Sequence, residues 1–239
     1  MKKVTEREVG RICRLIQDYI YENEKIVLGV SGGIDSDVVA RLCVKALSPD
    51  RVHLFFVVQE GVPEKRCSTV RELADELQCE LSIIDLQKMN IELVHKMHRS
   101  DMKNLNMDSF MDAHRAKCAL RVAIYSLYNE NDFIFCSTTN RTELETGACM
   151  LWGDMLGHIR PIAHLYKTQV YELARLVGTK ENVLSQAPSA DFWEGEDDMD
   201  DLSYMLLNRK QVTGYRRFSS QEMKEAEKIK EQISGKSID

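Results

Sequence analysis

The stretch Lys25 to Val39, KIVLGVSGGIDSDVV, decides the fold of this chain. Its first part, residues 26–30, is short, apolar and rich in β-branched residues, which is typical of a strand buried on both faces. The run ends at Gly32 and Gly33, which allow a tight turn and the close approach of a ligand. Apolar residues then recur at helical spacing up to Ala46, so the glycines precede a helix. Free N–H groups and the helix dipole favour an anion there, and the stretch therefore predicts a phosphate-binding turn.

The sequence of this turn excludes the two commonest nucleotide-binding loops. It lacks the Lys-Ser/Thr ending of a Walker loop, and it lacks the GxGxxG of dinucleotide-binding folds. The pattern that remains, SGGIDS at residues 31–36, resembles the SGGxDS loop of the ATP pyrophosphatases. In that superfamily the loop holds the β- and γ-phosphates, which leave as pyrophosphate while a substrate is adenylated. The alternative is an ordinary strand–turn–helix junction, against which six matching positions argue.

Composition and charge indicate one compact globular unit. With 239 residues, 44% of them hydrophobic and only four prolines, the chain suits a single domain (1–239) that ends in a helical segment (203–239). The net charge of −6 argues against a partner that is nucleic acid or a membrane surface. No apolar run approaches the ~20 residues of a membrane span. Seven cysteines without a CxxC pair indicate reduced thiols, and we expect a cytoplasmic protein.

Alternating apolar runs and helical patterns predict an α/β fold. After a first helix at 5–23, the predicted order is strand 26–30, helix to about 47, strand 52–58, helix 64–78 and strand 80–86. This order is typical of a doubly wound parallel sheet with flanking helices. Its ligand crevice lies at the carboxyl ends of the strands, where the glycine turn also lies.

The second half of the chain predicts a further helix pair and a fourth strand. The helix at 89–99 carries His95 and His98, whose spacing allows a metal site but is more typical of solvated or capping residues. The long helix at 110–128 has a broad apolar face for the core or for a second subunit. The strand at 132–136 runs directly into STTNRTE. This polar run indicates the ligand edge of the sheet, or a helix cap by Thr139 or Asn140 with Glu143 as its partner.

Taken together, the motifs of the chain resemble those of the ammonia-dependent NAD synthetases over residues 24–202. Several separated motifs in the right order are more specific than any one of them. They are SGGIDS at 31–36, DFIFCSTTNRTE at 132–143, GD at 153–154, RPI at 160–162, LYKTQVYELA at 165–174 and APSADFWEG at 187–195. The resemblance implies an adenine nucleotide alpha hydrolase-like fold.

The chemistry that this resemblance implies is amide formation in two steps. The carboxylate of deamido-NAD attacks the α-phosphate of ATP and releases pyrophosphate, and ammonia then displaces AMP from the acyl adenylate. ATP is therefore a substrate, and Mg²⁺ is implied on its phosphates. The family also implies a homodimer. The synthetase resemblance covers most of the chain, so we expect no glutaminase domain in it. We therefore expect the nitrogen donor to be free ammonia or ammonia from a separate glutaminase.

Roles for individual residues follow from their positions in the family motifs. Asp35 and Glu143 are implied as hard oxygen ligands of Mg²⁺, and the implied catalytic residues are Lys167, Asp35 and Asp154. The residues implied in ATP binding are Gly29, Ser31, Gly32, Gly33, Asp35, Ser36, Arg121, Thr138, Lys167 and Ser189. Plainer interpretations exist for three of these: Asp35 as a helix cap, Lys167 as a solvated residue and Asp154 as a turn residue.

Departures from the family pattern gather where the second substrate is expected. Met155 to His158 replaces small residues and a second aspartate, and Asp37 stands where a small residue is usual. Of the family's two arginines before the fourth strand, the chain keeps only Arg121. The C-terminal His-Lys segment has no match, and residues 219–235 are typical of a charged helix instead.

Three hypotheses follow. The leading one is an NAD synthetase, and the second is a related amide ligase that acts on a different carboxylate. The third is a nucleotide-binding scaffold that has lost turnover. Asp35, Glu143 and Lys167 together argue against the third, because a scaffold does not need two acidic metal ligands.

Overall fold

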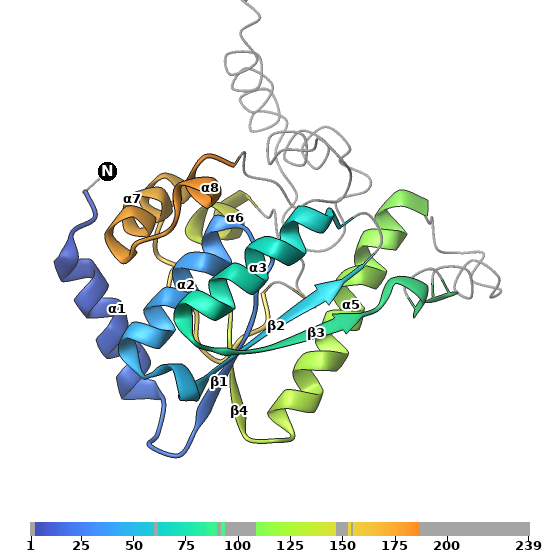
Figure 1. The fold of residues 1–239 in the computed structure, drawn as a ribbon, viewed down its shortest axis with the longest axis horizontal. Helices are drawn as coiled ribbons and strands as arrows, with labels where there is room; N and C mark the ends of the chain where they lie inside the picture. Colours follow the sequence, from blue (N-terminus) through green and yellow to red (C-terminus); the bar gives the residue numbers. More distant parts are fainter. Residues whose placement is uncertain are drawn as a thin grey trace, which may run out of the picture.

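A parallel sheet forms the centre of the molecule (Figure 1). The computed structural model describes residues 3–59, 62–89, 92–93, 109–146, 153 and 155–186. Within these residues the strands are β1 (Lys25–Gly29), β2 (Val52–Val58), β3 (Glu80–Asp85) and β4 (Phe133–Cys136). Neighbouring strands are all parallel, in the order β3-β2-β1-β4. The chain thus moves from β1 to one edge and then to the other side of β1, which confirms the predicted doubly wound sheet.

Helices cover both faces of this sheet. Ile26 and Leu28 belong to the larger core cluster, whereas Val27 between them belongs to the smaller one, as expected for the period of two along a strand. The larger cluster is shared with α1 (Glu6–Tyr19), α2 (Ile34–Ala46), α3 (Glu64–Leu77) and α7 (Lys167–Val177). The smaller cluster lies under α5 (Ser109–Asn129), on the opposite face (Figure 1). Shorter helices are η1 (Pro49–Arg51), α6 (Arg141–Thr146) and α8 (Glu181–Leu184).

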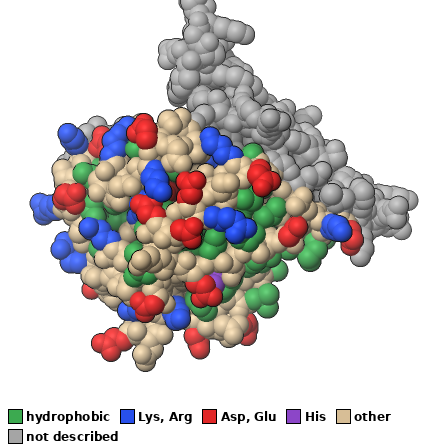
Figure 2. Space-filling view, viewed as in Figure 1, with side chains coloured by type: hydrophobic (Ala, Val, Ile, Leu, Met, Phe, Trp, Pro, Cys, Tyr) green, Lys and Arg blue, Asp and Glu red, His purple; other side chains and the backbone are tan. Residues whose placement is uncertain are grey.

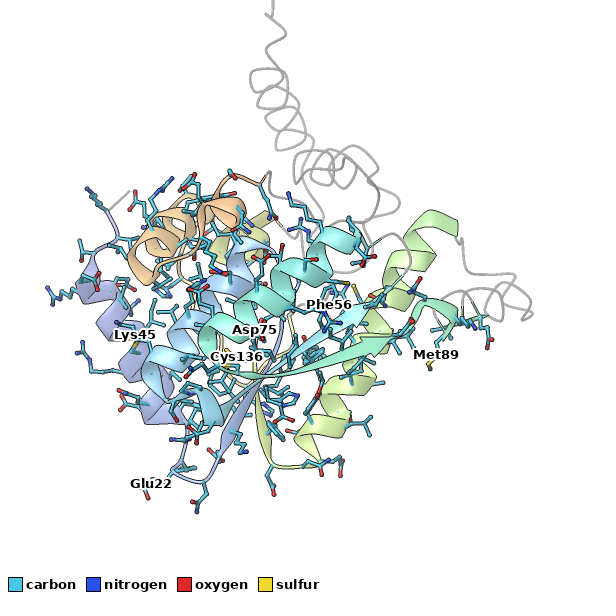
Figure 3. The ribbon with its side chains drawn as sticks, in the orientation of Figure 1. Glu22, Lys45, Phe56, Asp75, Met89 and Cys136 are labelled. Atoms are coloured by element: carbon cyan, nitrogen blue, oxygen red, sulfur yellow. The ribbon has the colours of Figure 1, made fainter. Side chains whose placement is uncertain are left out.

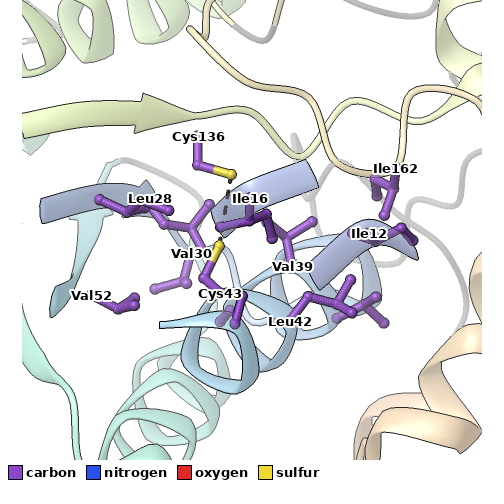
Figure 4. Packing of buried hydrophobic residues seen from close by; sticks show 14 of the residues in the cluster. Ile12, Ile16, Leu28, Val30, Val39, Leu42, Cys43, Val52, Cys136 and Ile162 are labelled. Carbon is purple, nitrogen blue, oxygen red and sulfur yellow. Dashed lines mark hydrogen bonds between the residues drawn. The ribbon is translucent and has the colours of Figure 1, made fainter. Parts of the chain in front are cut away.

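The larger core is packed from apolar side chains of the strands and of the helices on one face of the sheet, and Figure 4 shows the part between β1, α1 and α2. Ile16, Leu28 and Leu42 are fully buried, and each such side chain contributes about 1.5–3 kcal/mol relative to exposure. Two thiols meet in this core: the sulfurs of Cys43 and Cys136 lie 3.9 Å apart. Burial, together with the neighbouring thiol, raises the pKa of Cys136 well above its usual range, which keeps the thiol neutral.

The bounds of the elements follow the sequence pattern closely, with physical reasons for the differences. The first helix ends at Tyr19, earlier than predicted, because the backbone of Ile20 is extended. Strand β2 has the predicted bounds. Strand β4 begins one residue later than predicted because Asp132, at φ 61°, is left-handed and cannot belong to a strand. The predictions for His95, His98 and residues 203–239 lie outside the described residues.

The surface and the remaining cysteines agree with a globular interpretation. In Figure 2, acidic and basic side chains are interspersed over the visible face. No helix in the described ranges is long and apolar enough to cross a membrane. The cysteines that the structure describes are free thiols, four of them buried. Figure 3 shows Glu22, in the turn before β1, and Met89, beyond the end of β3, at opposite ends of the molecule.

Candidate active site

The candidate site lies where the winding of the sheet reverses. The connections that follow β1 and β4 leave the same edge of the sheet from adjacent strands but run on to different helices. In doubly wound sheets this switch point opens the crevice that takes the ligand. The SGGIDS turn follows β1 and the STTN run follows β4, so the fold brings together the two motifs that the sequence singled out.

The SGGIDS turn at residues 31–36, called the phosphate turn below, is held by the hydroxyl groups of its own serines. Gly32 has φ 77°, a conformation that glycine adopts without strain. The backbone N–H of Gly33 donates to Oγ of Ser31 at 3.2 Å, and the N–H of Ser31 donates to Oγ of Ser36 at 3.2 Å. The Ser36 hydroxyl donates in turn to the Gly33 carbonyl at 3.0 Å. Gly33 is the N-cap of α2, so N–H groups of a helix start lie beside two hydroxyl groups that can exchange partners with an anion.

The glycine at the end of β1 has a packing reason. A Cβ on Gly29 would lie 2.7 Å from the hydroxyl oxygen of Tyr125 and 3.1 Å from Cζ of Phe55. Only a residue without a side chain allows α5 to approach the sheet this closely. A role of Gly29 in ATP binding remains a prediction.

Asp35 and Lys167 form an ion pair between the starts of two helices. Nζ of Lys167 lies 2.5 Å from Oδ2 of Asp35, and their side chains are 20% and 16% exposed. Asp35 is the second residue of α2, where the helix dipole favours a carboxylate. Lys167 is the first residue of α7, where the dipole disfavours a cation. The position of Lys167 thus works against local helix stability, which is typical of a functional residue.

Asn140 connects the two carboxylates of the site. The sequence interpretation placed it in a polar run at the ligand edge of the sheet, or as a helix cap. Its fully buried amide donates from Nδ2 to Oδ1 of Asp35 at 3.0 Å and to Oε1 of Glu143 at 2.7 Å. Oδ1 of Asn140 accepts the N–H of Glu143, and Oε2 of Glu143 accepts the N–H of Asn140, both at 3.1 Å. The expected capping box is therefore present. It also fixes one amide between the two carboxylates.

The start of α7 is tied to the same loop. The backbone N–H of Lys167 donates to Oγ1 of Thr142 at 2.9 Å, and the N–H of Arg141 donates to the carbonyl of Leu165 at 2.8 Å. Thr138 lies half-buried between the buried residues Ser137 and Thr139. The fold thus brings Asp35, after β1, into contact with Asn140, after β4, and with Lys167 of α7, which are 105 and 132 positions away in the sequence.

The remaining predicted residues are placed as follows. Arg121 lies half-buried on α5, on the face of the sheet opposite to α2. Asp154 and Ser189 lie outside the described residues. Nδ1 of His158 accepts the backbone N–H of Phe135 at 3.0 Å, so one ring nitrogen of His158 is bound to β4.

Two carboxylates of this site suit a hard cation. Among the described residues, no group of three or more His, Cys, Asp or Glu side chains could hold a metal. Mg²⁺ does not require one, since it keeps several waters and takes one or two carboxylates together with substrate phosphates. Asp35 and Glu143 share the Asn140 amide, and their carboxylates therefore lie near each other and beside the phosphate turn. The Asp35 carboxylate has about four lone-pair sites, and the hydrogen bonds from Asn140 and Lys167 use two of them.

Asp37, one of the departures from the family pattern, belongs to a different structure. It is buried, and its Oδ1 accepts from Nε of Arg41 at 2.7 Å and from the hydroxyl of Thr179 at 2.6 Å. Arg41 also donates from both terminal nitrogens to Glu76, at 2.8 and 3.0 Å. Burial by itself would lower the pKa of Arg41, but the hydrogen bonds to Glu76 and Asp37 raise it. The unusual aspartate is thus explained by helix packing.

The comparisons with known proteins agree with this arrangement. A model of the NAD synthase family matches residues 8–237. The NH3-dependent NAD+ synthetase of Pyrococcus furiosus is 31% identical over 201 residues, which are 82% of this chain and 75% of that protein. Among solved structures, the NMN synthetase of Francisella tularensis has a TM-score of 0.76 at 24% identity and covers 100% of this chain and 89% of its own. The NH3-dependent NAD synthetase of Campylobacter jejuni has a TM-score of 0.68 at 21% identity, with 98% and 97% covered. These structures confirm the predicted fold.

Proposed function

The chain belongs to the NAD synthase family, and from this premise we propose that it is an ammonia-dependent NAD synthetase. It adenylates the carboxylate of deamido-NAD with ATP and transfers ammonia to give NAD, AMP and pyrophosphate. The observation that carries the proposal is the junction at Asn140, which joins Asp35 and Glu143 while Lys167 pairs with Asp35. An ammonium group, two carboxylates and a glycine turn at a helix start, all at one sheet edge, suit the binding and transfer of phosphate groups.

In the first step, a carboxylate oxygen of the substrate attacks the α-phosphorus of ATP, and the bond to the β-phosphate breaks. N–H groups and hydroxyls of residues 31–36 would hold the departing pyrophosphate. Lys167 would neutralise the charge that builds on the α-phosphate, and Asp35 would keep its ammonium group in place. Asp35 and Glu143 would hold Mg²⁺, which supplies charge neutralisation on the phosphate oxygens when bound.

In the second step, ammonia attacks the acyl carbon of the adenylate, AMP leaves, and the nitrogen loses a proton. Positioning is the main contribution that the protein can make here, because AMP is already a good leaving group. The proposal uses ammonia itself as the nitrogen donor, either free or from a separate glutaminase. It is supported by relatives whose names specify ammonia.

We further infer a cytoplasmic homodimer. The free thiols of the described residues suit a reducing compartment. The homodimer is carried over from the family resemblance, and α5, with Leu127 68% exposed, is the helix that we assign to the interface. Size-exclusion chromatography coupled to light scattering tests the dimer, and a monomeric mass at micromolar protein concentration would contradict it.

The function is tested by pyrophosphate release in the presence of Mg·ATP and ammonium. Deamido-NAD is compared with nicotinate mononucleotide and with small carboxylates, and the variant Asp35→Asn serves as the blank. We expect turnover with deamido-NAD and the appearance of NAD in equal amount. Turnover that prefers the mononucleotide, or ATP binding without turnover of any dinucleotide, would overturn the assignment of the substrate.

A further inference from the structure

Arg66 reaches the phosphate turn from a helix that carries no residue of the predicted site. It is the third residue of α3, it is 9% exposed, and its Nη1 donates to the carbonyl of Gly32 at 3.0 Å. The same nitrogen donates to the side-chain oxygen of Gln186. A Cβ on Gly32 would lie 3.3 Å from Cδ of Arg66 and 3.6 Å from Cβ of Thr69, so α3 packs directly against the turn.

The peptide that Arg66 contacts joins the two glycines of the turn. A peptide between two residues without Cβ atoms rotates with little steric resistance, so its direction needs an outside hydrogen bond to hold it. The peptides of the described residues are trans. In a trans peptide the C=O and the following N–H point in opposite directions. When the Gly32 carbonyl faces Arg66, the Gly33 N–H must therefore face away from α3.

The side to which the Gly33 N–H is turned is the side of the two serine hydroxyls. This N–H donates to Oγ of Ser31 at 3.2 Å, and Oγ of Ser31 lies 3.3 Å from Oγ of Ser36. Those are the groups that the proposed function assigns to the β- and γ-phosphates. The orientation set by Arg66 thus decides whether one of the anion-binding N–H groups of the turn points at the phosphates.

We propose that Arg66 is a positioning residue for the pyrophosphate half of ATP. It holds the Gly32–Gly33 peptide with its N–H toward the phosphates, and Gln186 holds the guanidinium in place. The proposal rests on the proposed function only in taking ATP as the ligand. It assigns a role in the phosphate turn to α3, and it predicts an effect on ligands with β- and γ-phosphates that ligands without them do not show.

The test compares affinities for ATP, pyrophosphate and AMP by titration calorimetry, which requires no turnover. Arg66→Met keeps the apolar stem of the side chain and removes its donors, and Arg66→Lys keeps a charged donor. Arg71→Met, on the exposed side of α3, is the matched control. We expect Arg66→Met to weaken ATP and pyrophosphate by about tenfold or more and AMP by less than about twofold. Arg66→Lys should recover most of the loss, and Arg71→Met should change nothing.

Other outcomes separate this proposal from the proposed function. Equal losses for ATP and AMP, or no loss for pyrophosphate, would overturn the role of Arg66 even if the enzyme makes NAD. A wild-type protein that binds ATP but leaves deamido-NAD unchanged would overturn the proposed function. The affinities for ATP, pyrophosphate and AMP would still decide the role of Arg66. If Arg66→Met does not fold, Gln186→Leu removes the second acceptor, and the same selective loss at smaller size is expected. Steady-state kinetics should then show a raised KM for ATP with little change in the KM for ammonium.

Discussion

Asp35 and Asp37 are two residues apart on α2, and they serve different ends. The Asp35 side chain is 16% exposed and meets Lys167 and Asn140 at the ligand edge of the sheet. The Asp37 side chain is 4% exposed and meets Arg41 and Thr179 within the helix layer. Two residues correspond to about 200° of helical rotation, so the two carboxylates leave the helix on nearly opposite sides.

The difference teaches how one helix can carry both a site and its support. Asp35 pairs with the first residue of α7, and Asp37 accepts from Thr179, just beyond the end of α7. Both ends of α7 are thus tied to α2, one through an accessible ion pair and one through a buried network. Breaking the first contact should lower the activity, and breaking the second should lower the free energy of unfolding.

The largest effect is expected on stability, from the buried carboxylate of Asp37. Asp37→Ala leaves Arg41 without one of its carboxylates in the interior, and removing one partner of a buried ion pair costs about 3–5 kcal/mol. Urea denaturation followed by circular dichroism measures the loss in free energy of unfolding. Asp35→Ala, as the matched control on the same helix, should cost only about 1–2 kcal/mol, mainly because the buried Asn140 amide loses one acceptor. Similar losses in the two variants would contradict the contrast.

Substitution of Asp35, the more exposed carboxylate, by asparagine should lower the activity and leave the stability nearly unchanged. Asp35→Asn removes the charge that holds Lys167 and, with it, a proposed Mg²⁺ ligand, so kcat should fall by about 10²–10³-fold. The midpoint of thermal unfolding should stay close to that of the wild type. Glu143→Gln should behave alike if the two carboxylates share the cation. Normal pyrophosphate release in both variants would remove them from the chemistry.

A somewhat smaller loss is expected at Lys167. Lys167→Ala removes one charge from the transition state and should lower kcat by about 10²-fold. Stability should change little, because the loss of the ion pair with Asp35 is offset by the removal of a cation that the helix dipole disfavours at the first position of α7. The control is Arg175→Ala on the exposed side of the same helix, which should leave the rate unchanged. A rate loss of less than about threefold would make Lys167 a surface residue.

The fold and the meeting of the two polar motifs could be predicted from the sequence, because both depend on local pattern. Apolar runs locate the strands, and a parallel sheet places whatever follows β1 and β4 at one edge, so the meeting of SGGIDS with STTN is predictable. The contribution of Arg66 was not predictable, since it depends on how α3 packs against Gly32. The role of Asp37 was only partly predictable: its i, i+4 spacing to Arg41 can be read from the sequence, but its contact with Thr179 depends on how the end of α7 packs against α2. The pattern N-x-x-E directly after a parallel strand indicated Asn140 as a cap, but its contact with Asp35 depends on how the start of α2 lies beside the end of β4.

The smallest effect concerns the outer carboxylate of the buried network and appears with pH. Hydrogen bonds from Arg41 lower the pKa of Glu76 from its usual value to about 2. A carboxyl with a lowered pKa stabilises the folded state at pH values above its unfolded pKa near 4.5, and this contribution is lost as the pH falls from about 5 toward 2. Because the side chain is 33% exposed, water screens the pair and the effect is modest. We expect the unfolding free energy of Glu76→Gln to depend less on pH between 5 and 2 than that of the wild type, and parallel pH curves would mean that the Arg41–Glu76 pair contributes nothing in solution.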